Sequence, residues 1–386
     1  MKMNRRNFVK LASTAPMLGM SQTNVFSNNL PNINERDNKN EVHFTGDGLH
    51  LTPLDYSKLL VQLAEDGKIK PDSYSLEGSI EELELKFAKL LGKESAIFMP
   101  TGTLANQIAI RSLANGASKV IVQDVSHIYN DSGDCLQTLS DLNLIPLAAG
   151  KATFTLEDVE KVIKRTNSGR VATRVGVISI ESPVRRKEGE MFDYDEMKKV
   201  SGFARKNEIK LHLDGARLFL ASAYSGISPS EYASHFDTVY VSLYKYFNSA
   251  SGAILAGSKD VIKDLYHVRR MFGSGLPQAW LFAAVASYYA DGFVDRFNEA
   301  VKISEELFKK LDAHAGFKVE RVKLGTNIAY IKPNETDAKI YKKRLAEKGV
   351  LLTEPDHENY FTLIVNESLR RKKSAELADI FIQSLK

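Results

Sequence analysis

A single lysine lies among aromatic residues at the end of an apolar stretch. Residues 237–243 are predicted to form a strand, and Lys245 follows between Tyr244 and Tyr246. A tract of small residues comes next and leaves room around the lysine for a bound group. Most lysines in such positions extend to water. A buried amine, however, has a lowered pKa and is nucleophilic, so Lys245 could form a covalent bond with a carbonyl compound.

Three other chemically active groups each follow a predicted strand: Asp214, His127 and the turn Thr101-Gly102-Thr103. Because ligands of open parallel sheets bind at the carboxyl ends of strands, we expect these groups to lie near the lysine. Each group also has an ordinary structural interpretation. Asp214 could form an ion pair with Arg217, a lone histidine is commonly held by hydrogen bonds, and many strand-to-helix turns contain threonine and glycine.

Together these groups match the chemical handles of pyridoxal phosphate. The amine of Lys245 could form an imine with the aldehyde, and the carboxylate of Asp214 could hold the proton of the pyridinium nitrogen. The start of a helix at Gly102 and Thr103 could bind the phosphate. The imidazole of His127 could stack on the ring and move protons. We therefore expect pyridoxal 5'-phosphate as the cofactor.

The elements that position these groups alternate between short apolar runs and amphipathic stretches. This rhythm predicts an α/β fold with a mainly parallel sheet and helices on both faces. The expected strands lie at residues 96–99, 119–122, 175–180, 209–213 and 238–243, and the expected helices include residues 105–114 and 194–206. Another helix is expected to begin at residues 79–82, where Ser-Ile-Glu-Glu has the form of a capping box.

The pattern of elements changes near Phe293. We expect a large cofactor-binding domain at residues 42–292 and a smaller α+β domain at residues 293–386. The elements expected in the smaller domain are helices at residues 293–314, 337–348 and from 373 onward, and strands at residues 317–321, 326–331 and 360–365.

Residues 1–41 resemble an export signal followed by a linker. The pair Arg5-Arg6 precedes a mildly apolar run at residues 11–20, which is too short to span a bilayer, and an Asn-rich segment follows. The pattern predicts export through the twin-arginine route, to the periplasm. The alternative is a disordered basic tail, in which case the protein would be cytoplasmic.

Charge and cysteine content narrow the functional classes. The formal net charge is +4, and Lys2, Arg5, Arg6 and Lys10 supply four positive charges before any acidic residue. The rest of the chain therefore has no net charge, which gives no electrostatic basis for binding nucleic acid. The single Cys135 excludes an internal disulfide and a cysteine metal cluster, and the eight histidines show no ligand spacing, so we expect no metal site.

The chain also resembles the threonine aldolase and aromatic amino acid β-eliminating lyase family of fold-type-I pyridoxal-phosphate enzymes. The segments that match, in the order expected for the family, are residues 90–106, 127–129, 212–218, 242–257, 269–275 and 326–328. The resemblance implies a fold-type-I, transferase-like architecture. It also implies a homodimer or homotetramer with shared active sites, because the active sites of the family lie at a dimer interface.

The resemblance implies a role for each of the matching site residues. Lys245 would be the Schiff-base lysine, Asp214 the partner of the pyridinium nitrogen, and His127 the residue that stacks on the ring. Gly102 and Thr103 would bind the phosphate. The remaining cofactor-binding residues would be Arg217, beside the cofactor phenolate and the substrate carboxylate, and Arg269 or Arg270, which would reach the phosphate from a neighbouring subunit.

Departures from the family pattern concentrate on the substrate side of the expected site. Gly46 occupies the position of a serine that helps to hold the substrate carboxylate, and Thr362 the position of an arginine on the last strand. Tyr244 replaces the serine that usually precedes the lysine. The cofactor site is therefore expected to be intact and the substrate-carboxylate site to be altered.

These patterns favour a carbon–carbon or β-eliminating lyase that acts on an amino acid or related amine and cleaves threonine poorly. An aminotransferase on the same fold is one alternative, which a pyridoxamine form and dependence on a keto acid would reveal. A catalytically silent exported binding protein is another. Retention of both Lys245 and Asp214 argues against the silent protein, since loss of function would remove the lysine first.

Overall fold

The computed structural model describes residues 40–334 and 336–386. These residues belong to one compact unit, Lys39–Lys386. Almost all of the expected export segment and linker, residues 1–39, lies outside the described residues. Within the described part of the chain, no helix is both long and apolar enough to cross a membrane.

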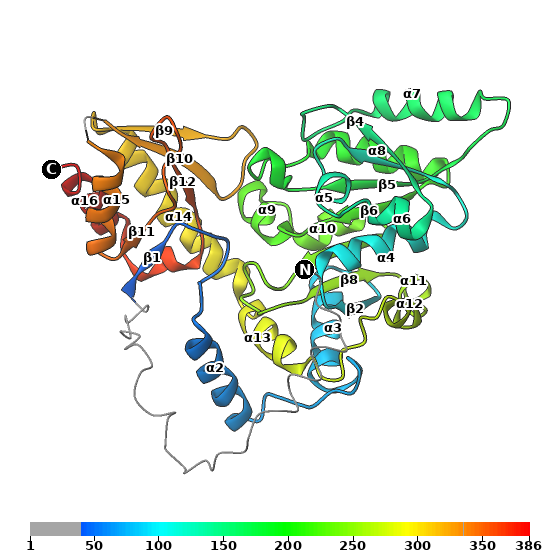
Figure 1. Ribbon diagram of the computed structural model, residues 1–386, viewed down its shortest axis with the longest axis horizontal. Coiled ribbons are helices and arrows are strands. Elements are labelled where there is room, and N and C mark those ends of the chain that lie inside the picture. The colour runs from blue at the N-terminus through cyan, green and yellow to red at the C-terminus, as the bar shows by residue number, and fades with distance from the viewer. Residues whose placement is uncertain (1–39, 335) are drawn as a thin grey trace, which may run out of the picture. The chain divides into compact units, whose positions relative to one another are not determined.

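A seven-stranded sheet forms the centre of the larger part of the unit (Figure 1). Its strands, in spatial order, are β2 (Ser95–Met99), β8 (Ala253–Gly257), β7 (Thr238–Ser242), β6 (Lys210–Asp214), β5 (Val175–Glu181), β3 (Lys119–Gln123) and β4 (Asn143–Leu147). Strand β8 runs antiparallel to both of its neighbours, and all other pairs are parallel. The prediction of a mainly parallel α/β sheet is confirmed.

Helices cover both faces of this sheet because side chains alternate along each strand. On β2, Ile97 and Met99 pack with the helix α4 (Gly102–Ala114), whereas Phe98 packs with α3 (Gly78–Leu90). The other helices of this part are α5 (His127–Asn130), α6 (Cys135–Ser140), α7 (Leu156–Asn167), α8 (Tyr194–Lys206), α9 (Leu218–Ser225), α10 (Pro229–Ser234), α11 (Lys259–Ile262) and α12 (Leu265–Met271), with the short 3-10 helix η2 (Arg185–Lys187).

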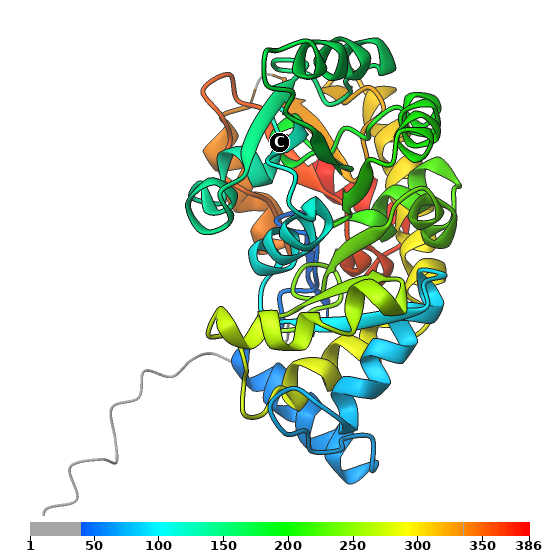
Figure 2. The ribbon, with the colours of Figure 1, turned by 90° about the vertical axis from the view of Figure 1, so that its right-hand side faces the viewer.

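Two helices that the sequence patterns did not predict flank the site. Helix α2 (Pro53–Glu65) begins with a capping box, in which Thr52 Oγ1 accepts the N–H of Asp55 at 3.1 Å and Asp55 Oδ2 accepts the N–H of Thr52 at 3.2 Å. Helix α13 (Trp280–Ala290) packs against both α2 and α3 (Figure 2).

The capping box expected at residues 79–82 is wrong. Helix α3 begins at Gly78, and its N-cap residue Glu77 makes no side-chain capping bond. The hydroxyl of Ser79 instead accepts the N–H of Lys70 at 2.9 Å. The helix itself is present where it was expected.

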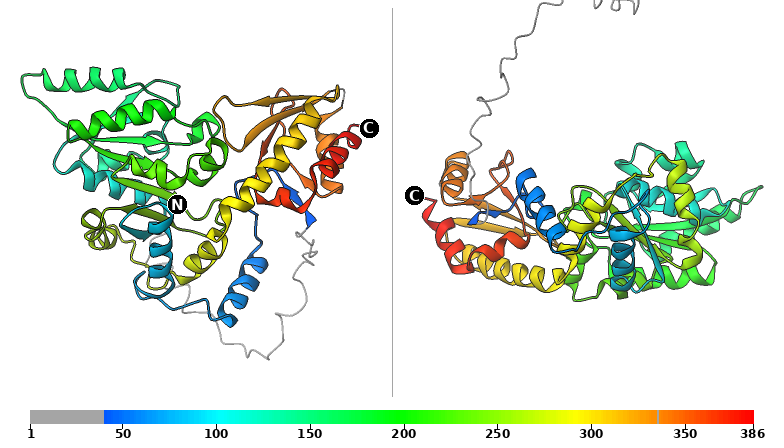
Figure 3. Two further views of the ribbon diagram at one scale, coloured as in Figure 1. Left: turned by 180° about the vertical axis from the view of Figure 1, so that it is seen from behind. Right: turned by 90° about the horizontal axis from the view of Figure 1, so that it is seen from below.

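The C-terminal part contains a three-stranded antiparallel sheet packed on a long helix, α14 (Phe293–Asp312) (Figure 3). Its other elements are β9 (Phe317–Arg321), β10 (Ile328–Pro333), α15 (Ala338–Glu347), β11 (Val350–Leu351), β12 (Phe361–Ile364), η3 (Glu367–Arg371) and α16 (Ser374–Gln383). Strand β1 (Val42–His43) pairs in parallel with β11, so the first described strand joins this part. The domain division at residue 293 stays a prediction.

A buried aromatic cluster fixes the loop that follows β7. Tyr246 and Phe247 are 1% and 0% exposed and pack with Phe219 and Phe293. The ring centres of Phe219 and Phe247 lie 5.2 Å apart, and those of Tyr246 and Phe293 lie 5.1 Å apart. Each such pair stabilises the fold by about 0.5–1.5 kcal/mol beyond its buried area. The cluster therefore holds the backbone of Lys245 in place.

Candidate active site

Two adjoining cavities open at the carboxyl ends of the parallel strands. The inner cavity has a volume of about 370 Å³ and the outer cavity a volume of about 950 Å³. The residues that line both are His127, Arg185, Arg217, Tyr244, Lys245 and Ala250. The inner cavity is also lined by Gly102, Thr103 and Asp214. The structure thus brings together six of the eight residues that the sequence placed in the site.

Lys245 follows β7 and lies at the junction of the two cavities. Burial, reinforced by the positive charge of Arg217, lowers the pKa of its amine to about 8. Its Nζ lies 5.0 Å from the ring centre of Tyr244, which is 48% exposed and lines both cavities. Tyr246 and Phe247 belong to the core, so Tyr244 is the aromatic neighbour of Lys245 that shapes the site.

Asp214 is the last residue of β6 and is held by a chain of buried polar groups. Its Oδ2 accepts the side-chain amide of Asn106 at 2.5 Å, and its Oδ1 accepts the N–H of Ala216 at 3.2 Å. Asn106 Oδ1 lies 2.9 Å from His212 Nε2, and His212 Nδ1 lies 2.8 Å from the hydroxyl of Thr238. Burial lowers the pKa of His212 to about 4, so this imidazole is neutral and the carboxylate is oriented without a cation beneath it.

The N-terminus of α4 faces the inner cavity. Thr101 caps the helix by accepting the N–H of Leu104 at 3.3 Å, and the helix begins at Gly102. A Cβ on Gly102 would lie 1.9 Å from the hydroxyl of Tyr240, so only glycine fits between this tyrosine and the cavity. The backbone N–H groups of the first turn have no partners within the helix and can bind an anion.

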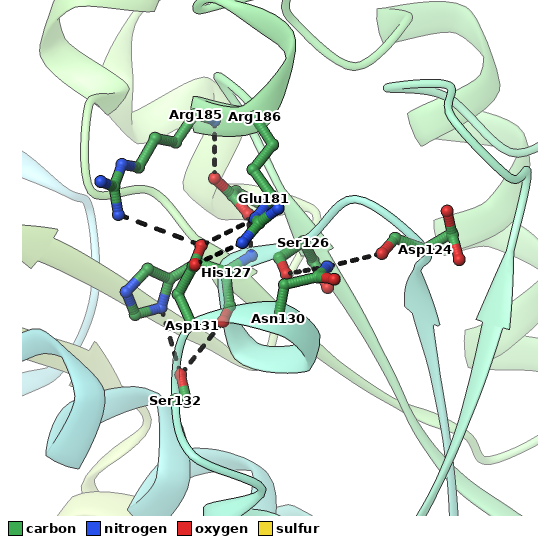
Figure 4. Close-up of polar contacts among 9 residues, drawn as sticks. All are labelled: Asp124, Ser126, His127, Asn130, Asp131, Ser132, Glu181, Arg185 and Arg186. Carbon is green, nitrogen blue, oxygen red and sulfur yellow. Dashed lines mark hydrogen bonds and ion pairs between the residues drawn. The ribbon is translucent and has the colours of Figure 1, made fainter.

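His127 begins α5, four residues after the end of β3, and its backbone is held by Glu181 (Figure 4). Glu181 Oε2 accepts the N–H of His127 at 2.6 Å, and Oε1 accepts the N–H of Arg185 at 2.8 Å. His127 Nδ1 lies 3.3 Å from the hydroxyl of Ser132. Burial and the nearby Asp214 raise the pKa of Glu181 well above its usual range. The buried carboxyl of Glu181 therefore holds the backbone of both His127 and Arg185.

Sequence reasoning gave no role to Glu181 or Arg185. Glu181 is the last residue of β5 and pairs in register with Asp214, the last residue of β6. It therefore has the same signal that identified Asp214, a carboxyl at the end of an apolar strand. Arg185 follows four residues later, in η2, and lines both cavities.

Arg217 forms an ion pair with Asp47 at the floor of the outer cavity. Its Nε donates to Asp47 Oδ2 at 2.8 Å, and the Asn327 side-chain amide donates to Asp47 Oδ1 at 3.0 Å. The two partners are 20% and 10% exposed. Asp47 therefore orients a guanidinium that lines both cavities and partly neutralises its charge.

The structure shows what surrounds Gly46 and Thr362, the two positions that depart from the family pattern. A Cβ on Gly46 would lie 2.9 Å from Nε2 of His50, so the histidine occupies the space that a serine side chain would need. His50 lines the outer cavity. Thr362 lies in β12 opposite Tyr330 and lines neither cavity.

Arg269 and Arg270 are not brought to Lys245 within this chain, since neither lines either cavity. Arg269 is 0% exposed and donates to the carbonyl oxygens of Phe98 at 2.6 Å and of Tyr74 at 3.3 Å. It fixes the loop at residues 74–75. Arg270 stacks on the ring of Tyr74, with its guanidinium carbon 4.8 Å from the ring centre.

Comparisons with known proteins agree with this geometry. The low-specificity L-threonine aldolase of Candida albicans is 30% identical over 272 residues, which cover 69% of this chain and 70% of that protein. A putative L-allo-threonine aldolase from Listeria monocytogenes EGD-E has a TM-score of 0.73 at 28% identity, over 90% of this chain and 96% of that one. A serine palmitoyltransferase from S. paucimobilis, solved with bound PLP, has a TM-score of 0.64 at 14% identity over 89% and 87% of the two chains, which shows a shared fold alone.

The fold and the site define a pyridoxal-phosphate-dependent enzyme of fold type I. The sequence model of the β-eliminating lyase family matches residues 65–334. The chain belongs to the β-eliminating lyase family, and it is a lyase that depends on pyridoxal phosphate.

The residues of the inner cavity fit pyridoxal phosphate. The glycine at the start of α4 leaves the helix N-terminus open for a phosphate, and Asp214 is a buried carboxylate that can hold a pyridinium proton. The amine of Lys245, with its lowered pKa, lines the same cavity. The inner cavity thus supplies an anion site, an acceptor for a proton and an amine, which are the three functions that the cofactor requires.

Proposed function

We propose that this enzyme breaks a bond at Cα or Cβ of an α-amino acid in the two adjoining cavities. The observation that carries the proposal is the convergence of Lys245, Asp214 and His127 on the inner cavity, next to an outer cavity large enough for a substrate. The names of the similar aldolases support an amino acid substrate. For a β-hydroxy amino acid, the Cα–Cβ bond breaks, the β-carbon leaves as an aldehyde, and Cα takes a proton to give glycine.

The cofactor, when bound, supplies the sink for the electron pair left on Cα. The chain supplies the groups that bind the substrate and move protons. We propose that Arg217, oriented by Asp47, binds the α-carboxylate. His127 has its Nδ1 beside the hydroxyl of Ser132, so its Nε2 is the nitrogen that takes the β-hydroxyl proton. The Lys245 amine, which carries a proton below a pH of about 8, can return that proton to Cα.

We further propose that threonine is a poor substrate. The resemblance placed a serine at Gly46 and an arginine at Thr362, and here the first space is filled by His50 while the second residue lines neither cavity. Losing one charge-assisted hydrogen bond to a carboxylate costs roughly 1.5–3 kcal/mol, or about ten- to a hundredfold in binding. Two such losses are expected to make threonine cleavage slow.

The test uses purified, cofactor-loaded protein and a panel of β-hydroxy and β-substituted amino acids. Release of glycine with an aldehyde, or of ammonia with a keto acid, supports the lyase. Both threonine diastereomers belong in the panel, and turnover of either at the rate of an authentic aldolase would contradict the proposal of an altered substrate site. Conversion of the cofactor to its pyridoxamine form with dependence on a keto acid would identify an aminotransferase instead. A protein that binds amino acids without converting them would be a silent binding module.

We propose that the enzyme is a homodimer or homotetramer in which a neighbouring subunit contributes to each site. Arg270 lies outside both cavities and stacks on Tyr74. Tyr74, Leu76 and Met271, which are close to one or the other of these two residues in the chain, are 45%, 43% and 74% exposed. Such a group of apolar side chains is typical of an association surface. Mixing an Arg270→Ala protein with a Lys245→Ala protein should restore part of the activity if Arg270 serves the partner's site. A monomer in sedimentation, or mixtures that stay inactive, would contradict it.

A further inference from the structure

Arg185 places a guanidinium at the entrance of the site. It begins η2, four residues after the end of β5, and its side chain is 60% exposed while lining both cavities. In Figure 4 its side chain extends toward the imidazole of His127. Its backbone N–H is held by the buried carboxyl of Glu181 at 2.8 Å, which fixes the start of the side chain. None of the proposed steps of the reaction uses this arginine.

The charge of Arg185 is only weakly balanced, because its nearest acidic neighbour is engaged by Arg186. Asp131 accepts Nε of Arg186 at 3.1 Å and Nη2 at 2.7 Å, which is a two-pronged ion pair. Nη1 of Arg185 lies 3.9 Å from the same carboxylate, too far for a hydrogen bond. The side chain of Glu181 faces the backbone of Arg185 and not its guanidinium. The guanidinium therefore remains able to bind another anion.

The two arginines that line both cavities lie at different depths. Arg217 is 20% exposed and lies close enough to the Lys245 amine to help to lower its pKa. Arg185 is 60% exposed, at the mouth. In an amino acid the α-carboxylate lies two bonds from the amine, so the arginine near the amine suits this group. The arginine at the mouth then faces the end of the substrate side chain.

We propose that Arg185 binds an acidic group at the end of the substrate's side chain, so that the enzyme prefers amino acids with a distal carboxylate over threonine. This inference rests on the proposed function and adds its substrate class. A guanidinium forms two parallel hydrogen bonds with a carboxylate, which gives both affinity and orientation. The outer cavity of about 950 Å³ has room for a side chain longer than that of threonine.

Arg186 has a positioning role in this arrangement. It holds Asp131 in a two-pronged pair and so keeps the carboxylate from closing on Arg185. Removing Arg186 leaves Asp131 free to approach Arg185, whose Nη1 is already 3.9 Å away. Arg186→Gln should therefore weaken binding of an acidic substrate, and adding Asp131→Asn to that variant should restore it.

The experiment compares L-aspartate with its neutral isostere L-asparagine on the cofactor-loaded enzyme. Binding is read from the change in the cofactor absorption spectrum during titration, which does not require turnover. The wild type should bind aspartate about ten- to a hundredfold more tightly than asparagine, as expected for one charge-assisted pair. Arg185→Gln should remove this preference and leave asparagine binding and cofactor retention unchanged. Lys187→Gln is the matched control, since this residue ends the same turn and lines neither cavity.

Several results would contradict the binding of a distal carboxylate by Arg185, and each points to a different role. An equal loss of aspartate and asparagine binding in Arg185→Gln would assign Arg185 to the α-carboxylate. A loss of cofactor would assign it to the phosphate. Tighter binding of O-phospho-L-serine than of aspartate would make the distal group a phosphate. A wild type that binds asparagine as tightly as aspartate rejects the inference alone, whereas a wild type that responds to no amino acid rejects the proposed function itself.

Discussion

The side-chain amide of Asn106 donates to Oδ2 of Asp214 at 2.5 Å, and both residues are nearly completely buried. A buried carboxylate is costly unless hydrogen bonds satisfy it. Asn106 meets this need with a neutral donor, and its carbonyl oxygen lies 2.9 Å from the neutral His212. Asp214 is therefore held by a neutral partner on one side while it lines the inner cavity on the other.

We predict that Asp214→Asn slows turnover of any confirmed substrate by roughly a hundred- to a thousandfold, because the charge opposite the pyridinium is lost. Cofactor should still be retained through the anion site and Lys245. Asp124→Asn is a suitable control, since Asp124 also follows a strand, β3, but lines neither cavity. Turnover of the Asp214 variant near the wild-type rate would leave this carboxylate with a structural role only.

The lowered pKa of Lys245 gives a prediction for pH. Only the neutral amine attacks an aldehyde, and its fraction rises with pH, so capture of pyridoxal phosphate by the cofactor-free protein should increase with a midpoint near pH 8. An ordinary lysine would show this rise near its usual pKa of 10.5. Because the charge of Arg217 helps to lower the pKa, Arg217→Gln should move the midpoint upward.

The measurement is borohydride reduction at each pH, followed by peptide mapping. The label should appear on Lys245 and should be absent from a Lys245→Arg protein. A midpoint near 10.5 would show that the pKa of the Lys245 amine is not lowered. A label on another lysine would reject the assignment of Lys245 as the cofactor-bearing residue.

Export remains a proposal about residues that the structure does not describe. The Arg5-Arg6 pair and the short apolar run after it are the reason for it. Fusing residues 1–45 to a reporter that folds before translocation should move the reporter out of the cytoplasm. Changing both arginines to lysine should stop this movement. If the reporter stays inside with either sequence, the segment is a basic tail and the protein is cytoplasmic.

The sequence predicted the sheet and most of the cofactor side of the site because both depend on local signals. Apolar runs mark β5, β6 and β7, and functional groups at the ends of such runs must meet at one edge of a parallel sheet. The position of Asp214 follows from this rule. Glu181 satisfies the same rule, but a sequence alone does not show that its carboxyl binds the backbone of two other site residues.

The features that the sequence could not reveal depend on contacts between distant segments. Arg269 looks like an anion ligand in a basic pair, yet its partners are carbonyl groups 171 and 195 residues away in the chain. Arg185 and Arg186 are adjacent and of the same type, and only the position of Asp131 distinguishes their roles. The capping pattern at Ser79 failed because the hydroxyl is used by the backbone of Lys70.

The contact between Gly46 and His50 supports a last prediction about substrate choice. Gly46→Ser would restore the hydroxyl that the family resemblance places there, but its Cβ would lie 2.9 Å from His50 Nε2. The single variant must displace the imidazole of the exposed His50, which lowers the free energy of unfolding, although by less than a clash in a packed core. Adding His50→Gly removes the clash and also suits the backbone, since residue 50 has a φ of 54°.

We therefore expect the double variant Gly46→Ser, His50→Gly to cleave threonine faster than the wild type, by up to about tenfold for one restored hydrogen bond to the carboxylate. The single variant should be less stable than the double variant in chemical denaturation. His50→Gly alone is the control, because it opens the space without adding a hydroxyl. Equal threonine turnover in the wild type and the double variant would show that the residue at position 46 does not contact the substrate carboxylate, and that the altered specificity lies elsewhere in the outer cavity.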